Sequence, residues 1–275
     1  MKKLISAILI LFLCLGIYSC SKKSDEDNLN ESTTTDNDTT TDTTAATLAE
    51  VTAVTTPTND TTPDYTFSSS EAGTITYGGS CSSSTTSATS GNNTIIFNAL
   101  AAGTYVNCTI TVTDSAGNAS SPLSVNTFVV DTTAPTVSSV SSSTANGYFG
   151  IGDNITITLT ANENLYVDNS SGNPRIQLET GSTDRYAIYS SGSGTNNLSL
   201  IYTVVISDNS TDLGYKASNS LELNSGTIRD SALNDAVLTL PNPGISNSLS
   251  LNKAIVINTT SSFGTSKYDK SIFGP

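Results

Sequence analysis

The sequence contains no histidine, and this absence removes many familiar kinds of active site. Ser-His-Asp and Cys-His catalysis, histidine general bases and histidine-ligated zinc or haem all need an imidazole. Enzymes that work through a pair of carboxylates, such as glycoside hydrolases, are the class that the composition leaves open.

Positive charge is also scarce. The chain has 11 Lys+Arg against 24 Asp+Glu, a formal charge of −13, and only 13% of its residues are charged. No lysine or arginine lies between Lys23 and Arg175. A basic patch that could neutralise phosphates is therefore missing over this stretch, and we expect no nucleic-acid partner.

No apolar run is long enough to span a bilayer as a helix. Residues 4–18 are apolar and follow Lys2 and Lys3, but a transmembrane helix needs about 20 such residues. This pattern predicts an export signal over residues 1–19. The segment ends in Ile17-Tyr18-Ser19-Cys20, which resembles the lipobox of bacterial lipoproteins. The resemblance implies cleavage before Cys20 and acylation of Cys20, whereas the alternative is an ordinary secretory signal with a chance cysteine.

Such a protein would meet the membrane through its N-terminal lipid, and several acyl chains would hold it there stably. In lipoproteins of the kind that this segment resembles, an aspartate directly after the acylated cysteine is associated with retention in the inner membrane. This chain has Ser21 at that position, so we expect it in the outer membrane. Residues 22–27 (KKSDED) resemble export signals that carry lipoproteins to the cell surface. After Cys20, a Ser/Thr/Asp-rich composition predicts a disordered tether over residues 20–57.

Beyond Pro57, short β-branched and aromatic runs alternate with turn residues, and no 3.6-residue apolar repeat is sustained. We therefore predict an all-β fold of two tandem sandwiches, at residues 58–135 and 136–258, with a C-terminal tail at 259–275. Residues 105–113 are predicted as one strand with Val106 and Cys108 on the same face. Residues 237–240 are predicted as another strand.

Several motifs in this region resemble the repeats of bacterial immunoglobulin-like (Ig-like) surface and adhesin-type proteins. They include Asp114-Ser115-Ala116-Gly117-Asn118, which has a counterpart in Asp230-Ser231-Ala232-Leu233-Asn234, and the linker Asp131-Thr132-Thr133-Ala134-Pro135. The resemblance covers roughly residues 58–258 and implies Ig-like architecture, with Tyr105 as a tyrosine-corner analogue. Because Leu233 replaces a glycine, we expect the second hairpin turn to differ from the first.

Four cysteines are present, and only Cys81 and Cys108 lie within a predicted domain. In an exported protein, two such cysteines are predicted to form a disulfide. Metal or redox chemistry at the pair is the alternative, but neither a C-x-x-C spacing nor a histidine supports it.

Acidic residues cluster near predicted turns, where capping and solvated roles are the default. Asp131, Glu163 and Asp230 form the best candidate for a structural Ca²⁺ site, since similarly placed acids lie near domain junctions in the repeats that this chain resembles and oxygen ligands suit calcium. Plain surface acids are the alternative for these three. The remaining candidates are Asp153, Asp168, Asp208, Asp212 and Asp235.

These features together predict a non-enzymatic, lipid-anchored protein that displays Ig-like domains as a spacer or adhesion module. Two alternatives stay open: a binding module for an extracellular glycan or protein, and a carboxylate-dependent hydrolase. Tryptophan is absent, so tyrosines would have to supply any sugar-stacking face. An exposed group of aromatic rings would favour the glycan, and a cleft with two carboxyl groups would favour the hydrolase.

Overall fold

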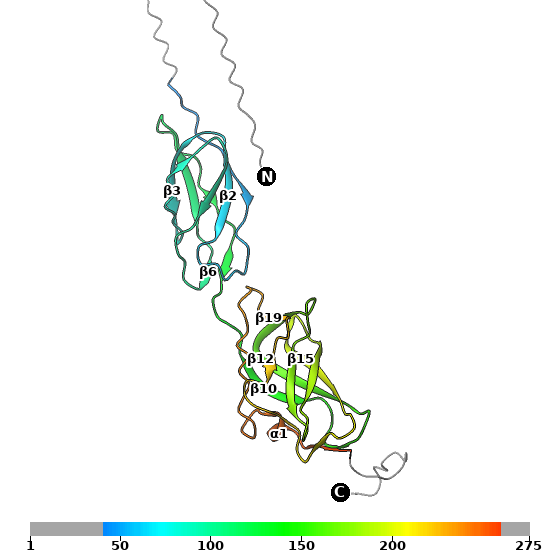
Figure 1. The fold of residues 1–275 in the computed structure, drawn as a ribbon. Coiled ribbons are helices and arrows are strands. Elements are labelled where there is room, and N and C mark those ends of the chain that lie inside the picture. Colours follow the sequence, from blue (N-terminus) through cyan, green and yellow to red (C-terminus); the bar gives the residue numbers. More distant parts are fainter. Residues whose placement is uncertain (1–40, 260–275) are drawn as a thin grey trace, which may run out of the picture. The chain divides into compact units, whose positions relative to one another are not determined.

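A computed structural model describes residues 41–259 of the chain (Figure 1). The predicted signal peptide, Cys20, most of the predicted tether and residues 260–275 lie outside the described residues. Strands dominate the described chain, which confirms the predicted all-β class. They form two groups that share neither a sheet nor a hydrophobic core, and we call these groups the first and the second sandwich.

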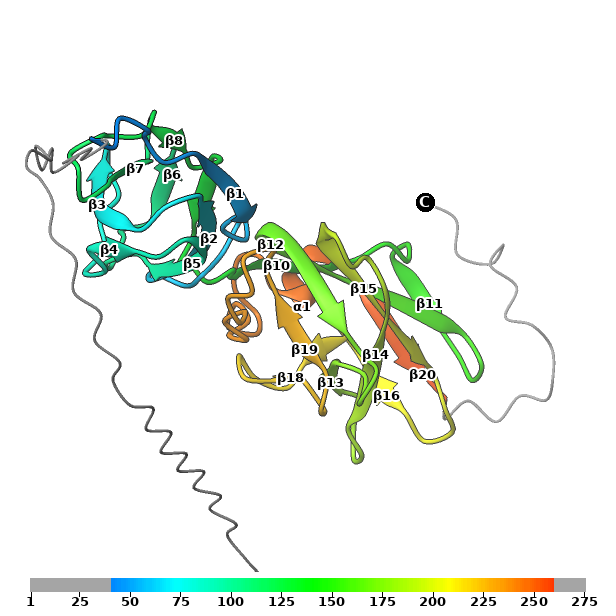
Figure 2. The same ribbon diagram turned by 90° about the horizontal axis from the view of Figure 1, so that it is seen from above.

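The first sandwich has nine short strands. They are β1 (Leu48–Thr52), β2 (Asp64–Ser69), β3 (Gly73–Gly78), β4 (Ser87–Ala88), β5 (Gly91–Ile96), β6 (Gly103–Tyr105), β7 (Thr109–Thr113), β8 (Leu123–Ser124) and β9 (Phe128–Val130). One sheet has the order β1-β2-β5, another has the order β4-β3-β7-β8, and β6 pairs with β9. Figure 2 shows β2 and β5 on one side of this sandwich and β3 and β7 on the other.

The two sheets enclose an aromatic core, because alternate residues of each strand point inward. Tyr65 and Phe67 of β2 are buried together with Phe97 and Phe128. The rings stack in the order Phe67, Tyr65, Phe97, Phe128, with neighbouring centroids 6.1 to 6.5 Å apart. The disulfide between Cys81 and Cys108 is present, as predicted, and both cysteines belong to this core. It ties the loop after β3 to the residue that precedes β7.

Two predictions for this region are wrong. The tether was expected to run to residue 57, but β1 already pairs with β2, with Leu48 opposite Ser69, so the ordered structure begins well before residue 57. The expected strand 105–113 is split into β6 and β7, and Val106 is exposed whereas Cys108 is buried. The alternation is lost because β6 pairs with β9 while β7 pairs with β3 and β8, so the chain changes partners between them.

The second sandwich is larger. Its strands are β10 (Val137–Ser142), β11 (Gly147–Phe149), β12 (Asn154–Asp168), β13 (Arg175–Glu179), β14 (Arg185–Ser191), β15 (Thr195–Thr203), β16 (Asn209–Ser210), β17 (Gly214–Tyr215), β18 (Leu221–Glu222), β19 (Thr227–Arg229) and β20 (Ile255–Asn258). A single helical turn, α1 (Leu249–Asn252), precedes β20. Within residues 41–259, no helix has the length and apolar character needed to cross a membrane.

The main sheet has the order β10-β12-β15-β14-β13-β17, and β11, β20 and β16 form a second sheet. Figure 2 shows β12, β15 and β14 of the main sheet as neighbours. The alternation at Ile155, Ile157 and Leu159 places all three side chains in the core, as predicted. The predicted strand at residues 237–240 is wrong: Val237 makes only an isolated bridge, to Thr136.

Candidate functional site

The hairpin after β19 is built by its own side chains. Both carboxylate oxygens of Asp230 accept hydrogen bonds from Asn234, one from the backbone N–H and one from the side-chain amide, each at 2.8 Å. The backbone of Asp230 also bonds to the carbonyl of Asn234 at 3.1 Å. Asp230 is only 2% exposed. Its buried charge is therefore compensated within the turn, which is the ordinary behaviour of aspartate in turns.

The same asparagine also holds the linker between the two sandwiches. Asn234 Nδ2 donates to the backbone carbonyl of Asp131 at 2.8 Å. Further along the linker, the carboxylate of Asp131 accepts from the N–H of Thr133 at 2.9 Å, and the N–H of Thr136 donates to Asn162 Oδ1 at 2.7 Å. The linker is thus held to other parts of the chain at Asn234 and Asn162, and braced internally between Asp131 and Thr133, before β10 begins.

Glu163 lies on β12 close to this linker. It lies two residues after the buried Ala161 and is itself half-buried. The β12–β15 register shifts between Thr160 and Leu165, so Glu163 lies where the strand leaves its regular ladder. Burial raises the pKa of Glu163, and the nearby charges of Asp230 and Asp131 raise it further.

The structure brings together the three acids predicted for a cation site. Asp131, Glu163 and Asp230 each offer a carboxylate oxygen, and these oxygens lie within 4.8 Å of one another. Three carboxylates this close repel one another, and a divalent cation with oxygen ligands is the kind of partner that relieves such repulsion. We call these residues the second triad.

A matching arrangement lies in the first sandwich and was not predicted from the sequence. Asp42, Glu71 and Asp114 also place carboxylate oxygens within 4.8 Å of one another, and we call them the first triad. Asn118 donates to the carboxylate of Asp114 through its backbone and its side chain, at 2.9 Å each. Its side-chain amide also donates to the backbone carbonyl of Asp42 at 3.0 Å.

The segments that lead into the two sandwiches, residues 42–47 and 131–136, make corresponding hydrogen bonds, and we call them the lead-in segments. The N–H of Thr44 donates to the carboxylate of Asp42 at 2.9 Å, as Thr133 does to Asp131. The N–H of Thr47 donates to Ser70 Oγ at 2.9 Å, as Thr136 does to Asn162. A sequence repeat could have revealed the first triad, because Asp42-Thr43-Thr44-Ala45 repeats Asp131-Thr132-Thr133-Ala134. The first copy, however, lies within the predicted tether.

The two hairpin turns are also alike, contrary to the expectation from Leu233. Gly117 N–H bonds to the Asp114 carbonyl at 3.3 Å, and Leu233 N–H bonds to the Asp230 carbonyl at 3.4 Å. Both residues have positive φ, 94° for Gly117 and 74° for Leu233. The leucine therefore adopts the left-handed backbone conformation of the glycine, although this conformation is unfavourable for residues that carry a Cβ atom.

The other candidate acids make local contacts. Asp153 accepts from the N–H of Gly150 at 2.9 Å, and Asp168 accepts from the N–H of Ser170 at 2.9 Å. Asp235 forms an ion pair of 2.6 Å with Arg229. Burial raises the pKa of Asp212. For Asp153 and Asp168, these contacts are the turn-capping role that was the default expectation.

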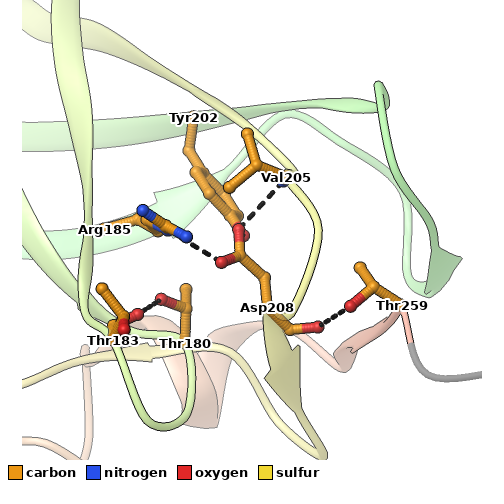
Figure 3. A network of polar contacts seen from close by, with 7 residues as sticks. All are labelled: Thr180, Thr183, Arg185, Tyr202, Val205, Asp208 and Thr259. Carbon is orange, nitrogen blue, oxygen red and sulfur yellow. Dashed lines mark hydrogen bonds and ion pairs between the residues drawn. The ribbon is translucent and has the colours of Figure 1, made fainter.

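Asp208 is the most enclosed of these acids, at 1% exposure, and it lies at the centre of a polar network (Figure 3). Its Oδ1 accepts from Arg185 at 2.8 Å, and its Oδ2 accepts from the Tyr202 hydroxyl at 2.6 Å and from Val205 N–H at 3.0 Å. Burial alone would raise the pKa of Asp208, but these hydrogen bonds outweigh burial and lower it. The network therefore holds an ionised carboxylate that closes the turn after β15.

Aromatic residues are mostly structural. The Tyr105 hydroxyl donates to the carbonyl of Ala101 at 2.9 Å, so Tyr105 bonds back to the preceding backbone as a tyrosine corner does. Its ring also stacks on Phe128 with centroids 5.1 Å apart. Two tyrosines in the described chain are clearly exposed, Tyr148 on β11 and Tyr166 on β12, and they lie on strands of different sheets.

Comparison with protein-family models gave no match, and comparison with curated proteins gave none either.

Proposed function

We propose that this chain is a non-enzymatic, lipid-anchored protein of the outer membrane that faces the cell surface and displays Ig-like sandwiches as a spacer or adhesion module. The observation that carries the proposal is the repeated lead-in. In each sandwich, an Asp-Thr-Thr-Ala segment is held by the asparagine of an Asp-x-x-x-Asn hairpin, at Asn118 and again at Asn234.

A repeated joint supports a structural role better than a catalytic one. Each hairpin uses the same kind of hydrogen bond, from its asparagine side chain to the backbone carbonyl of an aspartate, to fix the chain as it enters the sandwich. The most buried acid of the second triad, Asp230, has both carboxylate oxygens bonded to Asn234. An acid–base pair would instead need a carboxyl group free to exchange protons with a substrate.

We further propose that Ca²⁺ binds the second triad and stiffens the linker. The support is the closeness of Asp131, Glu163 and Asp230, together with the raised pKa of Glu163, which burial raises first and the charges of the other two acids raise further. A bound cation would relieve the repulsion among these charges and join the linker to β12 and to the hairpin.

The anchor is tested with Cys20→Ala in the full chain, with Cys14→Ala as the matched control because Cys14 lies within the predicted signal. Cys20→Ala is expected to abolish lipid labelling and to release the protein from membranes, whereas Cys14→Ala stays membrane-bound. Wild-type protein without acyl chains by mass spectrometry would contradict the anchor.

The cation is tested by comparing the full chain in millimolar Ca²⁺ and in chelator. Thermal melts and small-angle scattering are expected to show a higher midpoint and a narrower range of sizes with Ca²⁺. Asp131→Asn should remove this response, whereas Asp153→Asn, a turn acid outside both triads, should keep it. Identical melts and scattering profiles in both buffers would overturn the calcium proposal and leave the anchored spacer untouched.

A further inference from the structure

The second sandwich carries an open hollow of about 510 Å³ on the outer surface formed by β12, β19 and the following hairpin. Its walls include a phenol ring, a leucine, a carboxylate and a guanidinium, contributed by Tyr166, Leu233, Asp168 and Arg229. All of its lining residues belong to this one sandwich. The hollow borders the second triad through Asp230, but neither the acid triads nor the Asp208 network requires Tyr166, Leu233 or Asp168.

Strand geometry sets two of these side chains toward solvent. Tyr166 pairs with Arg229 and Asp168 pairs with Thr227 across the β12–β19 ladder. Leu165 is buried, and alternation along the strand therefore turns Tyr166 outward, where it is 44% exposed. The phenol ring thus forms a wall of the hollow and is not part of the core.

Leu233 is the unusual residue of the hollow. Its φ of 74° belongs to a region that side chains disfavour, and the equivalent residue of the first sandwich is Gly117. The leucine is also 62% exposed, so burial in the core does not offset the backbone cost. Strained backbone positions cluster at ligand contacts, and the exposed side chain of Leu233 gives this position an apolar surface for such a contact.

Charge restricts what that ligand is. Asp168 and Asp230 both line the hollow with a single guanidinium, that of Arg229, which pairs with Asp235 at 2.6 Å. Hydrogen bonds from Ser170 lower the pKa of Asp168, and the charge of Arg229 also helps to lower it. Three carboxylates are thus set against one guanidinium at this place. The chain as a whole has a formal charge of −13. The field in the hollow therefore attracts cations and repels anions.

We propose that the hollow binds a lysine or arginine side chain presented by a basic segment of a partner protein. Such a side chain has an apolar stem, which would pack between Tyr166 and Leu233, and a cationic head, which would reach Asp168. A neutral sugar would use the ring of Tyr166 but would gain little from Leu233 or from the negative field. The proposal requires neither the lipid anchor nor a cation at the second triad.

The test uses the full chain in detergent, labelled with ¹⁵N and kept in chelator, with capped hexalysine as the probe. Capped hexaglutamine and maltohexaose are the neutral peptide and neutral sugar comparisons. Hexalysine is expected to shift the amide signals of residues 166–168 and 231–233 most strongly, and the binding should weaken as salt is raised.

Two variants separate ligand contact from a structural role. Leu233→Gly removes the side chain and relieves the backbone, so it should raise the Kd for hexalysine about five-fold while the thermal midpoint stays the same or rises. Asp168→Asn should raise the Kd about three-fold. Asp64→Asn, an exposed acid of the first sandwich, is the matched control and should leave the Kd unchanged within about two-fold.

Three results would overturn the proposal. Hexalysine shifts spread over acids of both sandwiches, with every variant equal to the wild type, would show general attraction to an acidic protein. Maltohexaose binding at residues 166–168 that survives Leu233→Gly would show a sugar site. Unchanged hexalysine affinity in Leu233→Gly together with a lowered thermal midpoint would show that the leucine serves only the fold.

Discussion

Asn234 donates a side-chain hydrogen bond of 2.8 Å to the backbone carbonyl of Asp131, 103 residues earlier in the chain. The same amide nitrogen also donates to the carboxylate of Asp230 at 2.8 Å. One side chain therefore fixes the hairpin and the linker together. The pairing of Asn118 with Asp42 and Asp114 repeats this relationship in the first sandwich.

Replacing Asn234 by alanine should release the linker and destabilise the hairpin. The variant leaves the buried carboxylate of Asp230 and the carbonyl of Asp131 without this donor, at a cost of about 2 kcal/mol in the free energy of unfolding. Hydrogen exchange at the Thr133 and Thr136 amides should become faster, whereas amides of the β2–β5 ladder in the first sandwich should be unaffected. Unchanged exchange at both threonines would contradict the proposed role of Asn234.

Reduction of the Cys81–Cys108 disulfide should destabilise the first sandwich alone. The bond spans 27 residues, and closing such a loop stabilises the folded state by about 3.6 kcal/mol in the chain-entropy model. Denaturant unfolding with and without reductant should show a shift of the first-sandwich transition only, because all four cysteines precede residue 131. The double variant Cys81→Ala, Cys108→Ala is the control, and its unfolding should not respond to reductant.

The Asp208 network should make the second sandwich sensitive to acid. The pKa of Asp208 is lowered in the folded state, so its contribution to stability is present above the usual aspartate pKa and is lost as the pH falls through the lower, folded pKa. Tyr202→Phe removes one hydrogen bond to this carboxylate and should cost about 1.5 kcal/mol at neutral pH.

Melts of wild type and Tyr202→Phe across a pH series provide the measurement for Asp208. The difference between the two proteins should shrink at low pH, where the carboxylate is protonated. A difference that stays constant down to pH 2 would show that the carboxylate charge does not contribute through Tyr202.

Protons and Ca²⁺ should compete for the second triad. The pKa of Glu163 is raised, so in chelator its contribution to stability is present at low pH and is lost as the pH rises through this raised pKa. Calorimetric Ca²⁺ affinity should accordingly fall as the pH is lowered through the same range. Glu163→Gln should bind Ca²⁺ more weakly and with less dependence on pH, and an equally steep pH dependence in this variant would assign the proton to another acid.

Strand alternation explains what the sequence made predictable. Ile155, Ile157 and Leu159 are apolar at every second position and all lie in the core, so this part of β12 could be recognised. Strands such as β16 and β18 have two residues each, which is too short for a pattern, and their pairing depends on partners far away in the chain. Val106 looked like a core residue because the chain changes partners between β6 and β7, which no local pattern records.

In the candidate site, the contacts within one hairpin could be predicted from the sequence, whereas the contacts between distant segments could not. Asp230 and Asn234 bond within their own hairpin, so their spacing in the sequence indicates the turn directly. The pairing of this turn with Asp131 rested on a resemblance, since nothing local connects residues 103 positions apart. Asp42 was missed because its surroundings have the composition of a flexible tether, although Ser70 after β2 and Asn118 in the hairpin after β7 supply contacts that order this segment.

The matching lead-in segments at Asp42 and Asp131 define where one module can be cut from the chain. Deleting residues 42–130 would join Thr41 to Asp131, and the remaining chain would still present Asp-Thr-Thr-Ala to Asn234. Insertion of a further copy at the same point would likewise bring its own aspartate, glutamate and asparagine. Recombination at this short repeated sequence would therefore change the length of the protein by whole modules. Each module would keep the same contact between its Asp-Thr-Thr-Ala segment and its hairpin asparagine.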